Sequence, residues 1–223
     1  MIVSANLETV HTKIAVAAKE AQRPADSVEL VAVSKTQPAQ AVEAALQSGQ
    51  LVFGENRVQE AQEKFPALKQ HHRSLRVHLI GPLQTNKARQ AVELFDVIES
   101  LDRPKLARVL AKEMEHCQKR PDCLIQVNTG EEPQKAGVVP ADLPALLTLA
   151  RQELSLPVVG LMCIPPQDEP PALHFALLVK LAKQHDLKAL SMGMSSDYET
   201  AIRFGATSVR VGTGVFGPRQ VKP

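Results

Sequence analysis

The sequence alternates short, apolar, β-rich runs with longer segments of helical pattern, and this alternation limits the folds open to the chain. Roughly eight such runs occur, at residues 28–34, 51–55, 76–81, 95–100, 123–128, 157–163, 188–193 and 207–212. Several have apolar residues at consecutive positions, as strands covered on both faces of a parallel sheet do. Helical patterns precede and separate them, before Pro24 and at residues 38–48, 56–69, 84–93, 103–119, 141–154, 171–185 and 197–204.

Strands that alternate with helices in a chain of 223 residues predict a single TIM-like (β/α)₈ barrel that spans residues 1–223. The chain is near the short end for this fold, so its loops must be short. An open doubly wound sheet is the alternative, but the G-x-G-x-x-G motif is missing after the first run. Residues 164–173 include four prolines and predict a stiff loop at the barrel mouth after the sixth strand.

The composition argues against several classes of function. A net charge of +2 does not favour a nucleic-acid binder, and six Phe, one Tyr and no Trp leave little for base stacking. No apolar run approaches the roughly 18 residues of a membrane span, and the first residues do not resemble a signal peptide. The three cysteines lack zinc-like spacing, so we expect reduced thiols and a cytoplasmic protein.

Barrel proteins place function at the carboxyl ends of their strands, so the residues that end each run are the candidates. The first run ends at Lys35, where partial desolvation would free the amine to form a Schiff base, unless it is a solvated loop lysine. After the second run, Glu55 and Asn56 either contact a ligand or cap a helix. His78, within the third run, points either at a ligand ring or into the core.

Two further lysines follow later strands. Lys87 belongs to a polar cluster after the third run, which either faces the mouth or begins a helix. Lys135 lies on a loop of about a dozen residues after the fifth run, which is long for a barrel. Each is either a second reactive amine or a surface lysine, and the sequence does not decide between the two.

The seventh run leads into MGMSSD, one of two places where barrels often bind phosphate. Ser196 and Glu199 fit the capping box S-x-x-E, which predicts the beginning of a helix. The free N–H groups of such a helix and the hydroxyl of Ser195 would form an anion site. A plain capped helix is the alternative.

The eighth run ends in VRVGTG, the second of those places. Arg210 alternates with two valines and therefore points to the opposite face of its strand, where a guanidinium needs a partner. The glycines that flank Thr213 would let backbone amides approach a phosphate. With Lys35, these features fit one ligand that has an aldehyde, a ring and a phosphate, as pyridoxal 5′-phosphate does.

Five motifs in order, over residues 31–217, carry a resemblance: VAVSKTQP, VFGENRVQE, HLIGPLQTNK, LSMGMSSDYETAI and VRVGTGVFG. They closely resemble those of the pyridoxal phosphate homeostasis proteins, also called proline synthetase co-transcribed homologues. The resemblance implies one barrel similar to the N-terminal domain of alanine racemase. It also implies a protein that binds and buffers pyridoxal phosphate and delivers it to apo-enzymes, without catalytic turnover. We expect a monomer.

The resemblance assigns roles to residues. Lys35 would form the internal aldimine, and Arg210 would face the pyridine nitrogen. Other cofactor-binding residues would be Asn56, His78 and Met192 along the cofactor, and Ser195, Gly212 and Thr213 around its phosphate. Two positions depart from the family pattern, because Gln37 replaces a frequent second lysine and Arg57 replaces a frequent tyrosine.

Two other functions remain open at this stage. An amino-acid racemase needs a base on each face of the substrate carbon, and the only tyrosine here is Tyr198. An arginine beside the pyridine nitrogen leaves the ring a weaker electron sink, which favours holding the cofactor over carbanion catalysis. A Schiff-base aldolase acting on a sugar phosphate through Lys35 would be colourless and would need no cofactor.

Overall fold

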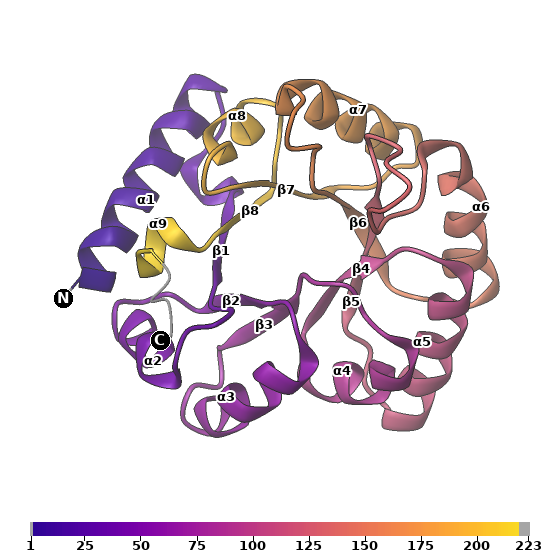
Figure 1. The fold of residues 1–223 in the computed structure, drawn as a ribbon, viewed down its shortest axis with the longest axis horizontal. Coiled ribbons are helices and arrows are strands. Elements are labelled where there is room, and N and C mark those ends of the chain that lie inside the picture. The colour runs from indigo at the N-terminus through magenta and orange to yellow at the C-terminus, as the bar shows by residue number, and fades with distance from the viewer. Residues whose placement is uncertain (1, 219–223) are drawn as a thin grey trace.

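A computed structural model describes residues 2–218 of the chain. Within them, eight parallel strands close into a barrel in sequence order, with the last strand paired to the first (Figure 1). The strands are β1 (Glu29–Val33), β2 (Val52–Glu55), β3 (Arg76–Leu79), β4 (Val97–Leu101), β5 (Asp122–Val127), β6 (Val158–Cys163), β7 (Ala189–Met194) and β8 (Ser208–Val211). The predicted TIM-like barrel is therefore confirmed, and the open sheet is wrong.

Helices surround the barrel and connect its strands (Figure 1). They are α1 (Ile2–Glu20), α2 (Ala39–Gln47), α3 (Val58–His71), α4 (Ala88–Leu94), α5 (Pro104–Cys117), α6 (Leu143–Leu147), α7 (Pro171–Gln184), α8 (Tyr198–Arg203) and α9 (Thr213–Phe216). Each predicted helical segment contains a helix, with bounds that differ by a few residues. The sequence did not predict the one-turn helix α9. Across residues 2–218, no helix has both the length and the apolar character to cross a membrane.

Two apolar layers follow from the alternation of side chains along the strands. Leu30 and Ala32 of β1 belong to the large cluster that fills the space between the barrel and its helices. A separate small cluster, formed by Val97, Leu124 and Met162, belongs to β4, β5 and β6. Because the strands are covered on both faces, their sequences show the consecutive apolar residues noted above.

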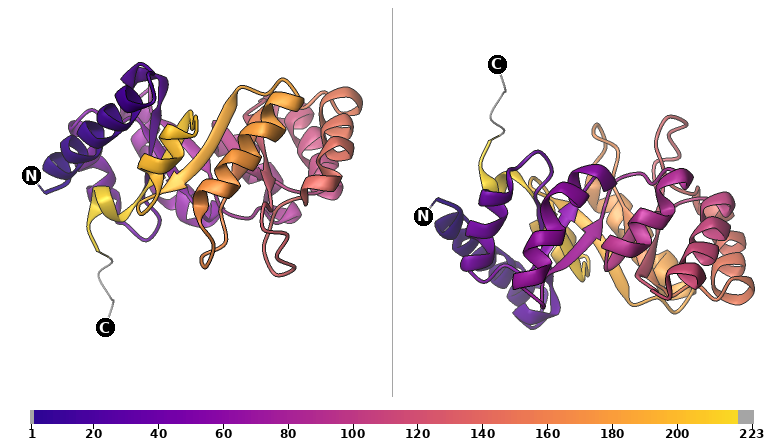
Figure 2. Two further views of the ribbon diagram at one scale, coloured as in Figure 1. Left: turned by 90° about the horizontal axis from the view of Figure 1, so that it is seen from above. Right: turned by 90° about the horizontal axis from the view of Figure 1, so that it is seen from below.

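The carboxyl ends of all eight strands meet at one end of the barrel, because the strands are parallel. The loops after β5 and β6 project from this end (Figure 2). They contact each other, since Lys135 Nζ donates to the carbonyl of Pro165 at 3.4 Å. Gly130 also lies so close to Pro166 that a Cβ at position 130 would be 2.3 Å from its ring. The proline-rich loop therefore stands at the mouth after the sixth strand, as predicted.

Candidate functional site

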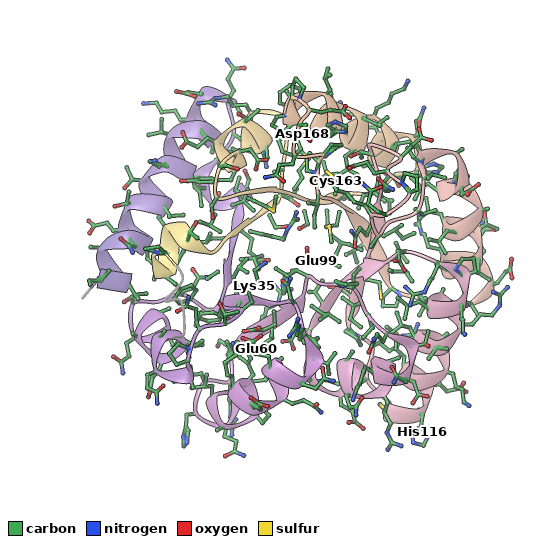
Figure 3. The ribbon with its side chains drawn as sticks, viewed as in Figure 1. Lys35, Glu60, Glu99, His116, Cys163 and Asp168 are labelled. Atoms are coloured by element: carbon green, nitrogen blue, oxygen red, sulfur yellow. The ribbon has the colours of Figure 1, made fainter. Side chains whose placement is uncertain are left out.

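The pairing of β1 with β8 brings the two ends of the sequence together at the mouth. Val31 is in register with Arg210, and Ala32 with Val211. Lys35 follows β1 by two residues and is half-buried, and Gly212 follows β8 directly. In the view along the barrel, Lys35 and Glu99 both lie close to its centre (Figure 3). The predicted lysine and the predicted glycine loop therefore share one corner of the mouth.

The loops after β7 and β8 meet through a hydrogen bond. The backbone N–H of Gly212 donates to Ser195 Oγ at 3.3 Å. Gly212 is also the N-cap of α9, so Thr213 and Gly214 are its first residues. The first N–H groups of a helix have no partner within the helix, and those of Thr213 and Gly214 can therefore bind an anion. The structure brings together the hydroxyl and the amides that the sequence suggested for a phosphate.

The predicted capping box is wrong. The N-cap of α8 is Asp197, and Ser196 is exposed. Asp197 Oδ1 instead accepts the backbone N–H of Met194 at 2.6 Å, which closes the turn after β7. The helix α8 therefore begins at Tyr198, one residue later than the motif indicates.

Arg210 lies on the face of β8 opposite its two neighbouring valines, as the alternation predicts, and the structure shows that this face is the barrel interior, where the side chain is 3% exposed. Its Nη1 donates to Ser191 Oγ at 2.5 Å, and its Nη2 donates to the carbonyl of Cys163 at 2.7 Å. Glu99 Oε2 lies 3.8 Å from Nη1 and supplies a counter-charge. A buried guanidinium is costly unless it is paired and hydrogen-bonded, and three other strands provide these partners.

Glu99 is the centre of this interior network. His78 Nδ1 lies 2.8 Å from its Oε1, and Ser191 Oγ donates to its Oε2 at 2.5 Å. Burial raises the pKa of Glu99, but His78, Arg210 and Ser191 together outweigh it and hold the pKa below its ordinary value. Glu99 is therefore a carboxylate, and His78 Nδ1 carries the proton of their hydrogen bond. Among the described residues, His78 Nε2 has no hydrogen-bond partner.

A second buried charge pair lies behind β1 and β2. Glu55 Oε1 is 2.5 Å from Lys64 Nζ of α3 and accepts the hydroxyl of Ser34 at 2.7 Å. Burial raises the pKa of Glu55, and the Lys64 ammonium opposes that rise. The expectation that Glu55 or Asn56 caps a helix is wrong, because Arg57 is the N-cap of α3 and no side chain caps it. Glu55 faces the helix layer because it alternates with Gly54 along β2.

The residue after Lys35 has an unusual backbone. Thr36 has φ +65°, in the left-handed region that a β-branched residue rarely adopts. Such a conformation costs on the order of 1–3 kcal/mol and persists only where the surroundings hold it. The backbone N–H of Thr36 donates to Glu60 Oε1 of α3. Strained backbone therefore lies directly beside the predicted reactive lysine.

The other predicted residues lie in different surroundings. Asn56 is half-buried at the end of β2, and its carbonyl is so close to Gly81 that a Cβ there would be 2.3 Å away. Met192 is completely buried within the main apolar cluster. Lys135 pairs with Glu132 Oε2 at 2.6 Å, and Lys87 is half-buried in a short 3₁₀ turn. The cofactor-binding roles of all eight predicted residues stay predictions.

Sequence reasoning missed Glu99, Lys64 and Glu60. Two of them left a signal: Glu99 is a carboxylate that directly follows the apolar pair Val97 and Ile98, and Lys64 falls on the buried face of α3 beside Ala61 and Phe65. An ionisable residue inside an apolar pattern needs a buried partner. The pattern could have singled out both residues, but it could not have named their partners.

The alanine racemase N-terminal domain family matches residues 6–220 of the chain. A pyridoxal phosphate homeostasis protein of Pseudomonas aeruginosa is 42% identical, over 97% of this chain and 96% of the relative. A pyridoxal phosphate homeostasis protein of Vibrio cholerae is 41% identical, over 96% of this chain and 95% of that relative. The chain belongs to the pyridoxal phosphate homeostasis protein family. The resemblance carried by the five motifs is thereby confirmed.

Solved structures agree with this family. PipY of Synechococcus elongatus, solved with pyridoxal phosphate bound, is 40% identical, with a TM-score of 0.82 over 96% of this chain and all of that one. The alanine racemase of Corynebacterium glutamicum is 19% identical, with a TM-score of 0.65. The match covers 96% of this chain but only 62% of the racemase chain. That second likeness shows the barrel fold alone.

Replacing Glu99 by glutamine should destabilise the protein in a pH-dependent way. The change leaves Arg210 buried without its counter-charge, and we expect the free energy of unfolding near pH 7 to fall by about 3 kcal/mol. Because folding lowers the pKa of Glu99 below its ordinary 4.5, its contribution is present above that value and is lost as the pH falls through the lower, folded value. Urea unfolding at pH 7 and at successively lower pH values below 4.5 should show that the difference in the free energy of unfolding between the wild type and the variant becomes smaller.

The matched control is Glu153→Gln, because Glu153 is exposed. It should change the free energy of unfolding by less than about 0.5 kcal/mol at either pH. A deficit of the Glu99 variant that stays equal at both pH values would contradict a stabilising charge at this position.

Proposed function

We propose that this protein binds pyridoxal 5′-phosphate at the carboxyl end of its barrel and takes part in the intracellular homeostasis of that cofactor. The observation that carries the proposal is the placement of Lys35 beside the loops that follow β7 and β8. Family membership supports it, because relatives about 40% identical are named for pyridoxal phosphate homeostasis and one was solved with the cofactor bound.

When bound, pyridoxal phosphate supplies an aldehyde that condenses with an amine and releases one water molecule. Lys35 is the amine that we assign to it. Ser195, Gly212 and Thr213 are the residues that we assign to the phosphate. The N–H groups of Thr213 and Gly214 and the hydroxyl of Ser195 would donate hydrogen bonds to it, which suits their donor chemistry.

The interior network would set the polar environment of the bound ring. Arg210 is fixed by Ser191 and the Cys163 carbonyl, so it presents a positive charge that does not move with the ligand. We assign it to the pyridine nitrogen, which it would leave unprotonated. Asn56 and His78 are the remaining residues that we assign to the walls of the site, and Met192, which packs in the main apolar cluster, is assigned to the layer behind them.

We further propose that the protein holds and delivers the cofactor without turnover of its own. A racemase needs a second base opposite the lysine. Tyr198, the only tyrosine in the sequence, is 5% exposed and packs against Gly193, and burial raises its pKa. These features favour a carrier, and its recipients would be apo-enzymes that use pyridoxal phosphate. We expect the acting species to be a monomer.

Lys35→Ala should abolish covalent capture. Added pyridoxal phosphate should give the wild type a visible absorbance band that borohydride removes, because reduction fixes the lysine linkage. The variant should show no band, or one at least about tenfold weaker. Lys87→Ala and Lys135→Ala are the controls and should keep the band. A wild type that stays colourless would overturn the cofactor assignment.

Pyridoxal lacks the phosphate that we assign to the loops after β7 and β8, so it should bind much more weakly than pyridoxal phosphate. Two charge-assisted hydrogen bonds of about 1.5–3 kcal/mol each correspond to a loss of roughly 100-fold or more in affinity. Absorbance titrations of the wild type with both ligands measure the difference. In the Ser195→Ala variant, the difference in affinity between pyridoxal phosphate and pyridoxal should be smaller. Equal affinities of the wild type for the two ligands would contradict a phosphate site at these loops.

Delivery is tested separately from binding. The cofactor-loaded protein is mixed with an apo-enzyme that requires pyridoxal phosphate, in the presence of a phosphatase that destroys free cofactor. Reactivation should persist under these conditions, while the same amount of free pyridoxal phosphate should fail to reactivate the enzyme. Reactivation no faster than with free cofactor, and equally sensitive to the phosphatase, would contradict delivery and leave binding intact.

A further inference from the structure

Helix α3 carries two charged residues, Glu60 and Lys64, that enclose the turn on which Lys35 stands. We propose that they are positioning residues, which hold the backbone of residues 34–37 so that the Lys35 amine meets the cofactor aldehyde. This inference rests on the proposed function and adds residues to the same site. Glu60 and Lys35 lie on the same side of the barrel (Figure 3).

Lys64 holds the two ends of the turn. Its Nζ donates to the carbonyl of Ser34 at 2.8 Å and to the carbonyl of Gln37 at 3.2 Å. The turn also closes on itself, since the N–H of Gln37 donates to the carbonyl of Ser34 at 3.0 Å. The Lys64 side chain is 8% exposed, so water competes little for these bonds. One buried ammonium therefore fixes the residues on both sides of Lys35 and Thr36.

Glu60 holds the middle of the turn. Its Oε1 accepts the N–H of Thr36 and lies 3.0 Å from Lys64 Nζ, one helical turn further along α3. Thr36 has the left-handed φ of +65°, which a β-branched residue does not adopt without support. Without this acceptor, the turn would relax toward negative φ and change the direction of the preceding side chain.

The barrel anchors the ammonium from the other side. Glu55 Oε1 lies 2.5 Å from Lys64 Nζ and also accepts the Ser34 hydroxyl. The N–H of Ser34 donates in turn to the carbonyl of Gly54 on β2. The turn therefore has ties to β2 and to α3. Removing Lys64 would leave Glu55 buried without its counter-charge, so Glu60 is the better residue to change.

The test compares two ligands that differ at one group. Pyridoxine 5′-phosphate has an alcohol in place of the aldehyde, so it uses the phosphate and ring contacts but forms no bond to Lys35. For Glu60→Ala, we expect the rate of appearance of the visible band with pyridoxal phosphate to fall about 10- to 100-fold, while the Kd of pyridoxine phosphate changes less than about twofold. Glu63→Ala, an exposed position of α3, is the matched control and should change neither.

Two further variants separate positioning from general damage. Glu60→Gln keeps an oxygen acceptor for the Thr36 N–H. With pyridoxal phosphate, this variant should form the visible band at most of the wild-type rate, unlike Glu60→Ala. Thr36→Gly removes the steric penalty of the left-handed backbone, so the effect of Glu60→Ala should be smaller in the double variant. Circular dichroism and urea midpoints report whether each variant is folded.

The outcomes distinguish this inference from the proposed function. A wild type without a visible band contradicts the proposed function itself. A wild type with a band, and a Glu60→Ala variant that forms it as fast as Glu63→Ala, contradicts the positioning role alone. Parallel losses for both ligands would also contradict it, because they would indicate a change in the whole site.

Discussion

The hydrogen bonds between β8 and β1 close the sheet, and the candidate site exists because of that closure. They place Val31 beside Arg210, so the turn after β1 and the glycine loop after β8 become neighbours although most of the chain lies between them in sequence. A closed barrel leaves no strand edge unpaired. It also fixes which loops share the mouth, and only then can Lys35 and Thr213 face one ligand.

Two buried charge clusters stand on opposite sides of the barrel wall. Inside, Glu99 balances Arg210 and orients His78. Outside, Glu55 balances Lys64 beneath the turn that carries Lys35. Buried charges rarely add stability compared with apolar packing, and they are retained where a specific arrangement is needed. We interpret the first cluster as fixing the charge under the ring and the second as fixing the direction of the reactive amine.

The same barrel occurs in proteins that differ in what surrounds it. The likeness to the racemase covers 62% of that enzyme's chain and shows the barrel fold alone. Function depends on the site more than on the fold. With Tyr198 buried in the helix layer, the described residues offer a lysine, an arginine and a phosphate cradle. These are the groups to which we assign the binding of the cofactor.

The sequence alone determined the barrel, the end at which the candidate site is expected, and the placement of Arg210 on the strand face opposite its two neighbouring valines. These follow from local periodicity, because strands buried on both faces read as apolar runs and side chains alternate along a strand. Only the tertiary structure decided that Arg210 pairs with Ser191 and Glu99, that Lys64 holds the Lys35 turn, and that α8 begins at Tyr198. Such contacts join residues far apart in sequence and depend on strand register, which no local pattern encodes.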